Sequence, residues 1–85
     1  MSTRNIKILV VEDEALIAMD IKEKLVDMGY DVLKITDNGA DAIKIAEELK
    51  PDIVLMDIVI KGSMDGIEAA EIIWEKFRIP SLFLT

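Results

Sequence analysis

Acidic side chains follow two apolar runs of this sequence, and together they could hold a divalent cation. Glu12, Asp13 and Glu14 come directly after one run. Asp57 comes directly after another. Carboxylates that lie close together repel one another, so one of them becomes protonated unless a cation neutralises the set. Mg²⁺ suits such a set because it binds carboxylate, carbonyl and water oxygens.

The same residues could carry phosphoryl chemistry. A carboxylate such as that of Asp57 can accept a phosphoryl group, and a divalent cation can neutralise phosphate oxygens. Thr85, at the end of a third apolar run, could offer its hydroxyl to a phosphoryl oxygen. The structural alternative is that acidic residues after strands are helix caps, which the helix dipole favours. Taken singly, each residue fits that alternative. Their joint occurrence after alternate apolar runs favours a site.

Short apolar runs alternate with segments of helical periodicity along the chain. The apolar runs 6–11 and 52–56 predict buried strands. Residues 31–35 predict a second, weaker strand, and 80–85 begin a fourth. Apolar residues at helical spacing predict three helices: 14–28, 39–50 and 67–77. In the first helix the inward stripe is expected to be Leu16, Ile17, Ile21, Leu25 and Met28. The alternation predicts an α/β domain with a parallel sheet.

This order of elements predicts that the carboxylates lie at one edge of the sheet. In an open parallel sheet, ligands bind beyond the carboxyl ends of the strands, where the strand order reverses. If strands 6–11 and 52–56 are neighbours, Glu12, Asp13 and Asp57 converge on one edge of the sheet. Strand 31–35 could then be the outer strand.

Composition narrows the chemistry available to the chain. There is no Cys and no His, which excludes disulfides, thiolate chemistry and histidine as base, metal ligand or phosphoryl carrier. The net charge of −7 argues against a nucleic-acid surface. No apolar run approaches the roughly 18 residues of a membrane span, and the first residues lack the apolar region of a signal peptide. We therefore expect a cytoplasmic protein that binds neither nucleic acid nor membrane.

Four segments of the sequence carry a resemblance to response-regulator receiver domains of two-component signalling. They are ILVVEDE (8–14), DIVLMD (52–57), MDGIEA (64–69) and IPSLFLT (79–85), in the order and close to the spacing of that family. The resemblance implies a flavodoxin-like fold with a parallel sheet in the order 2-1-3-4. That order places the first and third strands side by side.

The resemblance also implies roles for individual residues. Asp57 matches the aspartate that receives a phosphoryl group from a sensor histidine kinase or a phosphotransfer protein. Glu12 and Asp13 match the acidic pair that holds Mg²⁺ or Mn²⁺ with Asp57, and Val59 matches the position whose backbone carbonyl also binds the metal. Thr85 matches the hydroxyl residue that contacts the phosphoryl group. Such a domain is a phosphoacceptor rather than an enzyme.

The sequence departs from the family pattern in three places. Loop 58–63 is one residue longer than usual. Val59 is apolar where many relatives carry a polar side chain, and we expect this to lengthen the lifetime of the phosphoryl group. The chain contains neither the fifth strand, with its phosphate-pairing lysine, nor the last two helices. We therefore expect residues 1–85 to be the N-terminal part of a single receiver domain, impaired in phosphorylation. We also expect it to self-associate through the exposed edge at 81–85 or through its exposed faces.

Other function classes fit the sequence less well. A Mg²⁺-dependent enzyme of the haloacid-dehalogenase type usually has a second aspartate two residues after its nucleophile, where this chain has Val59. A flavin phosphate would be repelled by Glu12 and Asp13. A silent receiver-like module for interaction or dimerisation stays open as the alternative to the phosphoacceptor.

Overall fold

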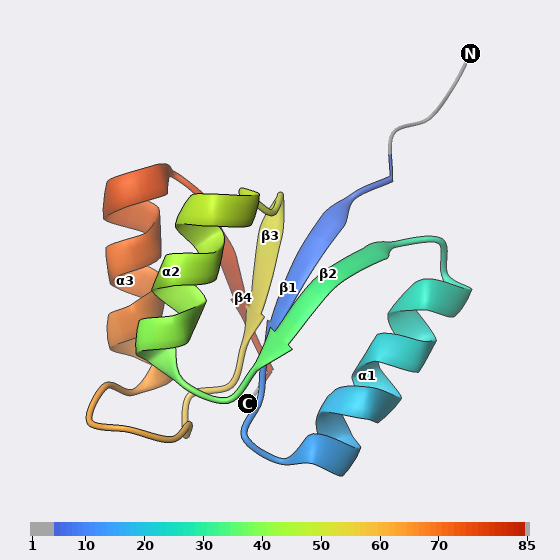
Figure 1. The fold of residues 1–85 in the computed structure, drawn as a ribbon, viewed down its shortest axis with the longest axis horizontal. Coiled ribbons are helices and arrows are strands. Elements are labelled where there is room, and N and C mark those ends of the chain that lie inside the picture. The colour runs from blue at the N-terminus through green and yellow to red at the C-terminus, as the bar shows by residue number, and fades with distance from the viewer. Residues whose placement is uncertain (1–4, 85) are drawn as a thin grey trace.

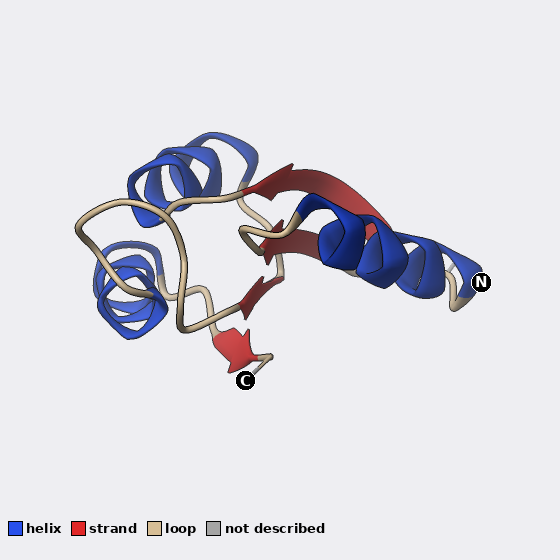
Figure 2. Cartoon of the chain, turned by 90° about the horizontal axis from the view of Figure 1, so that it is seen from below, coloured by secondary structure: helices blue, strands red, loops and turns tan. Residues whose placement is uncertain are grey.

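The chain forms four strands and three helices within residues 5–84, which are those that the computed structural model describes. They are β1 (Lys7–Val11), α1 (Ala15–Asp27), β2 (Asp31–Thr36), α2 (Gly39–Leu49), β3 (Ile53–Met56), α3 (Gly66–Phe77) and β4 (Ser81–Phe83). The strands form one parallel sheet in the order β2-β1-β3-β4. α2 and α3 cover one face of the sheet and α1 lies on the other (Figure 1 and Figure 2).

The observed order confirms the predicted α/β fold and the predicted 2-1-3-4 sheet. Most element bounds differ from the expected ones by only one or two residues. β4 is shorter than the expected 80–85, and it begins only after Pro80, which has no N–H to give to the ladder. The Pro80 carbonyl nevertheless accepts a hydrogen bond from the Val54 amide at 3.0 Å. Thr85 lies outside the described residues.

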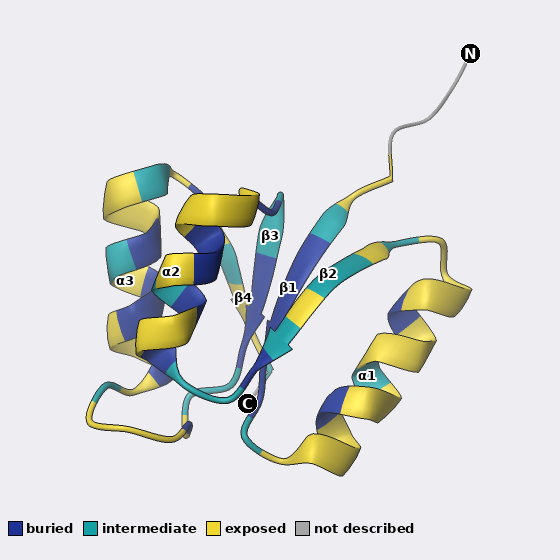
Figure 3. Ribbon diagram, viewed as in Figure 1, coloured by how far each residue is buried: buried dark blue, intermediate teal, exposed yellow. Residues whose placement is uncertain are grey.

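The larger part of the core lies between the sheet and the two helices α2 and α3. β1 and β3 contribute the side chains that water reaches least, and small residues of the helices allow close approach (Figure 3). The members of this cluster are Leu9, Val11, Ala42, Ile45, Ala46, Val54, Met56, Ile60, Ala69, Ile73 and Ile79. Burial of each large aliphatic side chain stabilises the fold by roughly 1.5–3 kcal/mol. This packing holds β1 and β3 rigidly side by side.

The α1 face of the sheet is covered more thinly. Ile8, Val10 and Leu55 pack there against Leu25 of α1. The expected inward stripe of α1 is wrong at Leu16 and Ile17, which are 87% and 44% exposed, and at Met28, which lies at the end of the helix and is 66% exposed. Leu16 precedes the buried Ala18 by two residues, which is about 200° around an α-helix. The inward face therefore runs through Ala18, Ile21 and Leu25 instead.

All strands point the same way, so their carboxyl ends meet at one edge of the sheet, the lower edge in Figure 1. In the register of the sheet Val11 pairs with Met56 on one side and with Thr36 on the other. The residues that follow β1 and β3 therefore leave the sheet at the same level. This register, rather than any local feature, brings the candidate site together.

Candidate metal and phosphoacceptor site

Backbone hydrogen bonds of the sheet fix the positions from which the acidic side chains extend. The Asp57 amide donates a 3.0 Å hydrogen bond to the Val11 carbonyl, so the pairing of β1 with β3 continues up to Asp57. On the other side of β1, the Glu12 amide donates to the Thr36 carbonyl at 2.9 Å. The chain thus holds Glu12 and Asp57 side by side, each as the first residue after its strand.

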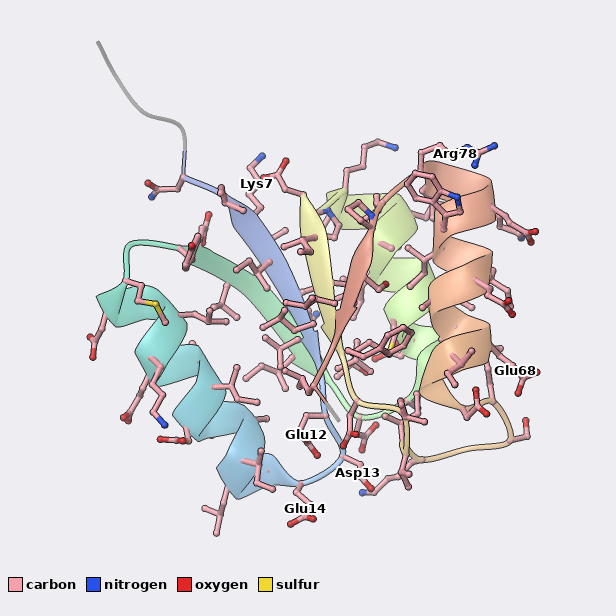
Figure 4. All side chains as sticks on the ribbon, turned by 180° about the vertical axis from the view of Figure 1, so that it is seen from behind. Lys7, Glu12, Asp13, Glu14, Glu68 and Arg78 are labelled. Carbon is pink, nitrogen blue, oxygen red and sulfur yellow. The ribbon has the colours of Figure 1, made fainter. Side chains whose placement is uncertain are left out.

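Glu12, Asp13 and Asp57 come together as the sequence predicts. Each of the three offers a carboxylate oxygen, and these oxygens all lie within 4.8 Å of one another. Figure 4 shows Glu12 and Asp13 at the carboxyl end of β1, at the opposite edge of the sheet from Lys7 and Arg78. The three residues line one depression together with Val59 and Leu84.

Glu14 is the acidic residue of the first group that does not join this cluster. It occupies the N-cap position of α1, but its side chain accepts no cap hydrogen bond. Its backbone amide instead donates to a carboxylate oxygen of Glu12 at 3.1 Å. The helix-cap alternative therefore does not account for this acidic group, whereas Asn38 and Asp65 are true side-chain caps of α2 and α3.

The cluster is electrostatically unfavourable without a cation. Glu12 is only 6% exposed. Burial raises the pKa of Glu12 above its ordinary value of 4.5, the Glu14 amide opposes this by its hydrogen bond, and the charge of Asp57 raises it again. A divalent cation would relieve the repulsion, and a donor set made only of oxygen atoms is what Mg²⁺ and Mn²⁺ prefer. The residues present fit such an ion.

The predicted roles of two other site residues, Val59 and Thr85, stay predictions. Val59 lines the same depression and is 74% exposed. That its carbonyl binds the metal stays a prediction. Thr85 lies outside the described residues, and its contact with a phosphoryl group also stays a prediction.

A sequence profile of the family described as response regulator receiver domain matches residues 8–85. The chain belongs to this family. The predicted resemblance is thereby confirmed. Within the described part of this receiver domain, no helix has the length and apolar character to cross a membrane.

Known proteins that are similar to this receiver chain belong to several kinds of regulator. The transcriptional regulatory protein PdtaR of Mycobacterium tuberculosis is 42% identical over 79 residues, which cover 93% of this chain and 38% of PdtaR. The signal receiver domain of a modulated diguanylate cyclase from Desulfovibrio desulfuricans G20 is 40% identical, with a TM-score of 0.88 over 93% of this chain and 63% of that one. The anti-anti-sigma factor PhyR from Bartonella quintana, in complex with the anti-sigma factor NepR, is 33% identical, with a TM-score of 0.85 over 93% of this chain and 33% of that one. The receiver chain thus spans less than two thirds of each relative.

Sequence reasoning missed two features of the receiver site that depend on its loops. Lys61 joins the loop after β3 to the loop after β2, because its amide donates to the Asp37 carbonyl at 3.0 Å and its Nζ lies 3.4 Å from Asp37 Oδ2. The Asn38 side chain and Lys61 together hold the pKa of Asp37 below its ordinary value. A lysine five residues after a strand carries no sequence signal for this pairing.

The second missed feature is Gly66, the first residue of α3. From the sequence, Asp65 and Gly66 indicate only a turn and a helix start. In the receiver fold Gly66 packs directly on the backbone of Asp57, and its amide donates to the Ile58 carbonyl at 2.8 Å. A glycine just after a helix-capping aspartate is a weak signal, because glycine has several other uses at such positions.

Proposed function

We propose that this receiver domain accepts a phosphoryl group on Asp57 from the phosphohistidine of a sensor histidine kinase or phosphotransfer protein. Mg²⁺ or Mn²⁺ would be held by Glu12, Asp13 and Asp57, with the Val59 carbonyl as a further ligand. The observation that carries the proposal is the meeting of three carboxylate oxygens within 4.8 Å in an open depression. Such a module works in the cytoplasm and is not a dedicated enzyme.

The chemistry follows from what each residue can do. A carboxylate oxygen of Asp57 attacks the phosphorus, an O–P bond forms, and the P–N bond to the donor imidazole breaks with its electron pair left on nitrogen. Bound Mg²⁺ supplies positive charge against the phosphoryl oxygens. Glu12 and Asp13 would hold the ion, and the hydrogen bond from the Asp57 amide to Val11 orients the acceptor. Thr85 donates its hydroxyl to a phosphoryl oxygen.

The same proposal includes an expectation about the charge around Asp57. Among the described residues, no basic side chain lines the depression that contains Asp57. A cation there would stabilise the negative charge that builds up on the transferring group. We therefore propose that positive charge beside Asp57, whichever group supplies it, speeds the phosphoryl transfer.

The test uses beryllofluoride, which mimics a phosphoryl group, on the purified receiver domain. With Mg²⁺, the parent domain is expected to show a change in its amide spectrum that Asp57→Asn abolishes. Glu14→Gln is the matched control, since it removes one negative charge from the same edge outside the cluster and should leave the response intact. Absence of any Mg²⁺-dependent response in the parent domain would refute the proposal.

The second candidate is a silent interaction or dimerisation module. Two observations favour it: the exposed apolar side chains Leu82 and Phe83 on β4, and the likeness to PhyR, which is known in complex with the anti-sigma factor NepR. A module of this class would bind a partner protein or a second copy equally well with and without beryllofluoride. Binding that changes with beryllofluoride supports the phosphoacceptor instead.

A further inference from the structure

We propose that Gly66 is a positioning residue for the phosphoacceptor, because the absence of a side chain lets the first residue of α3 press on the Asp57–Ile58 peptide. This contact sets where the Asp57 carboxylate stands relative to Glu12 and Asp13. The inference deepens the proposed function and rests on it for its consequence, although the contact itself can be tested separately.

The contact leaves no room for a methyl group. A Cβ placed on Gly66 would overlap the Asp57 carbonyl oxygen and would lie 2.9 Å from both the Asp57 carbonyl carbon and the Ile58 Cα. These neighbours are backbone atoms, so they cannot swing aside as the end of a side chain can. Gly66 has no positive φ, unlike Gly29 and Gly62, so space and not backbone conformation is what requires glycine here.

Asp57 is held from the opposite side as well. Its amide donates to the Val11 carbonyl at 3.0 Å, and the Leu84 amide donates to the carbonyl of the preceding Met56 at 2.9 Å. The Asp57 backbone therefore lies between the sheet and the start of α3. Any push from residue 66 must either break this pairing or rotate the Asp57 peptide. Both move the carboxylate relative to Glu12 and Asp13, which belong to the chain that continues from β1.

The start of α3 is itself fixed, so it cannot retreat easily. Asp65 and Glu68 form a capping box, with the Glu68 amide donating to Asp65 Oδ1 at 2.9 Å. Met64 and Ala69 pack against Gly39 of α2, where an added Cβ would lie 3.0 Å from Met64 Sδ and 3.1 Å from the Ala69 Cβ. The MDGIEA segment thus draws α3 against both α2 and Asp57. Its sequence serves the site, not only the helix start.

Metal binding would respond to this displacement more sharply than stability does. Mg²⁺ requires its ligands in near-ideal octahedral positions, so a shift of a few tenths of an ångström in one carboxylate matters. A glycine with only a structural role would lower stability when replaced, but would leave the metal affinity of the folded protein unchanged. The two roles therefore predict different results.

The experiment compares Gly66→Ala with Gly62→Ala in the purified chain. Gly62 lies in the same loop with φ of +96° and nothing within 4 Å of an added Cβ, so its replacement strains the backbone without touching Asp57. We expect Gly66→Ala to shift the amide resonances of Asp57, Ile58 and Glu12 and to weaken Mn²⁺ binding, followed by paramagnetic broadening, about tenfold or more. Gly62→Ala should lower thermal stability, with a Mn²⁺ dissociation constant within about twofold of the parent.

The outcomes separate this inference from the proposed function. Folded Gly66→Ala with unshifted Asp57 resonances, or with parental Mn²⁺ affinity, overturns the positioning role. If the parent chain binds no Mn²⁺, the metal part of the proposed function fails, while the Asp57 amide shift still decides whether Gly66 positions it. Should Gly66→Ala not fold, Asp65→Ala releases the capping box without adding an atom near Asp57. That variant is expected to shift the Asp57 amide and weaken Mn²⁺ binding, and an unchanged amide and affinity would overturn the inference.

Discussion

Glu12 and Asp57 stand at the carboxyl ends of two neighbouring strands, close enough for each to offer an oxygen to one cation. Glu12 is nearly inaccessible to water and Asp57 is half-buried. Their repulsion therefore has little solvent to screen it. The fold holds this pair in place through the packing of β1 and β3, so the cation that relieves the repulsion would bind to a site that is already assembled.

The pH dependence of stability should report on Glu12. Its folded-state pKa is raised, first by burial and further by the Asp57 charge, against the opposing Glu14 hydrogen bond. The stability that the protonated group contributes is present below its unfolded pKa, near 4.5, and is lost as pH rises through the higher folded value. In EDTA, the melting temperature of the parent should fall relative to Glu12→Gln as pH rises from about 4 to about 8.

The same variant distinguishes the site from an ordinary buried acid. With saturating Mg²⁺ the parent should regain stability at high pH, whereas Glu12→Gln should gain less because it has lost a charge that binds the ion. Its Mg²⁺ affinity is expected to be about tenfold lower. Parallel melting profiles for parent and variant at all pH values would contradict the account of Glu12 given above.

Val59 should control the lifetime of a phosphoryl group on Asp57. Its apolar side chain is 74% exposed in the depression that contains Asp57, and it cannot hydrogen-bond an attacking water. In the phosphorylated receiver domain, Val59→Asn should shorten the half-life of the phosphoryl group on Asp57 by about tenfold or more, because the asparagine amide can orient the attacking water. The measurement is loss of label after removal of the donor. Val59→Ala is the control for size, and equal half-lives of parent and Val59→Asn would refute the idea.

Ser81 should be replaceable by alanine with a gain in stability. Its hydroxyl oxygen is buried and makes no hydrogen bond to any described residue. A buried hydroxyl without a partner is unfavourable by about 1–3 kcal/mol, so Ser81→Ala should raise the free energy of unfolding in urea by about 1 kcal/mol. Ser63→Ala, in an exposed loop, should change nothing. A loss of stability in Ser81→Ala would contradict this prediction.

The β4 edge should drive self-association of this chain. Within the described residues β4 pairs only with β3, and Leu82 and Phe83 are 58% and 44% exposed. Unpaired edge strands with apolar side chains invite pairing with another copy, and lysine opposes it. Light scattering at high concentration should show dimers or larger species for the parent and fewer for Phe83→Lys.

A matched control is available on the opposite face. Leu16 is even more exposed, at 87%, but lies on α1 away from the sheet edge, so Leu16→Lys adds the same charge and should leave self-association unchanged. A monodisperse parent at high concentration would argue against the edge, as would an equal effect of both variants.

The sequence by itself determined the element types, the sheet and the identity of the acidic cluster. Apolar runs such as 52–56 can only be buried strands in this context, and a parallel sheet places whatever follows its strands on one edge. Glu12, Asp13 and Asp57 were therefore predictable as a group. The inward face of α1 was not predictable. Leu16 and Ala18 lie on different sides of the helix, and the periodicity of apolar residues alone does not say which side packs on the sheet.

Only the tertiary structure decided how the loops hold the site. The pairing of Lys61 with Asp37 joins two loops that are more than twenty residues apart in the chain. The contact of Gly66 with the Asp57 backbone depends on how closely α3 approaches the sheet, which in turn depends on the packing of Ala69 and Met64 against Gly39. Such distances arise from the sum of many packing contacts, and no local pattern of residues encodes them.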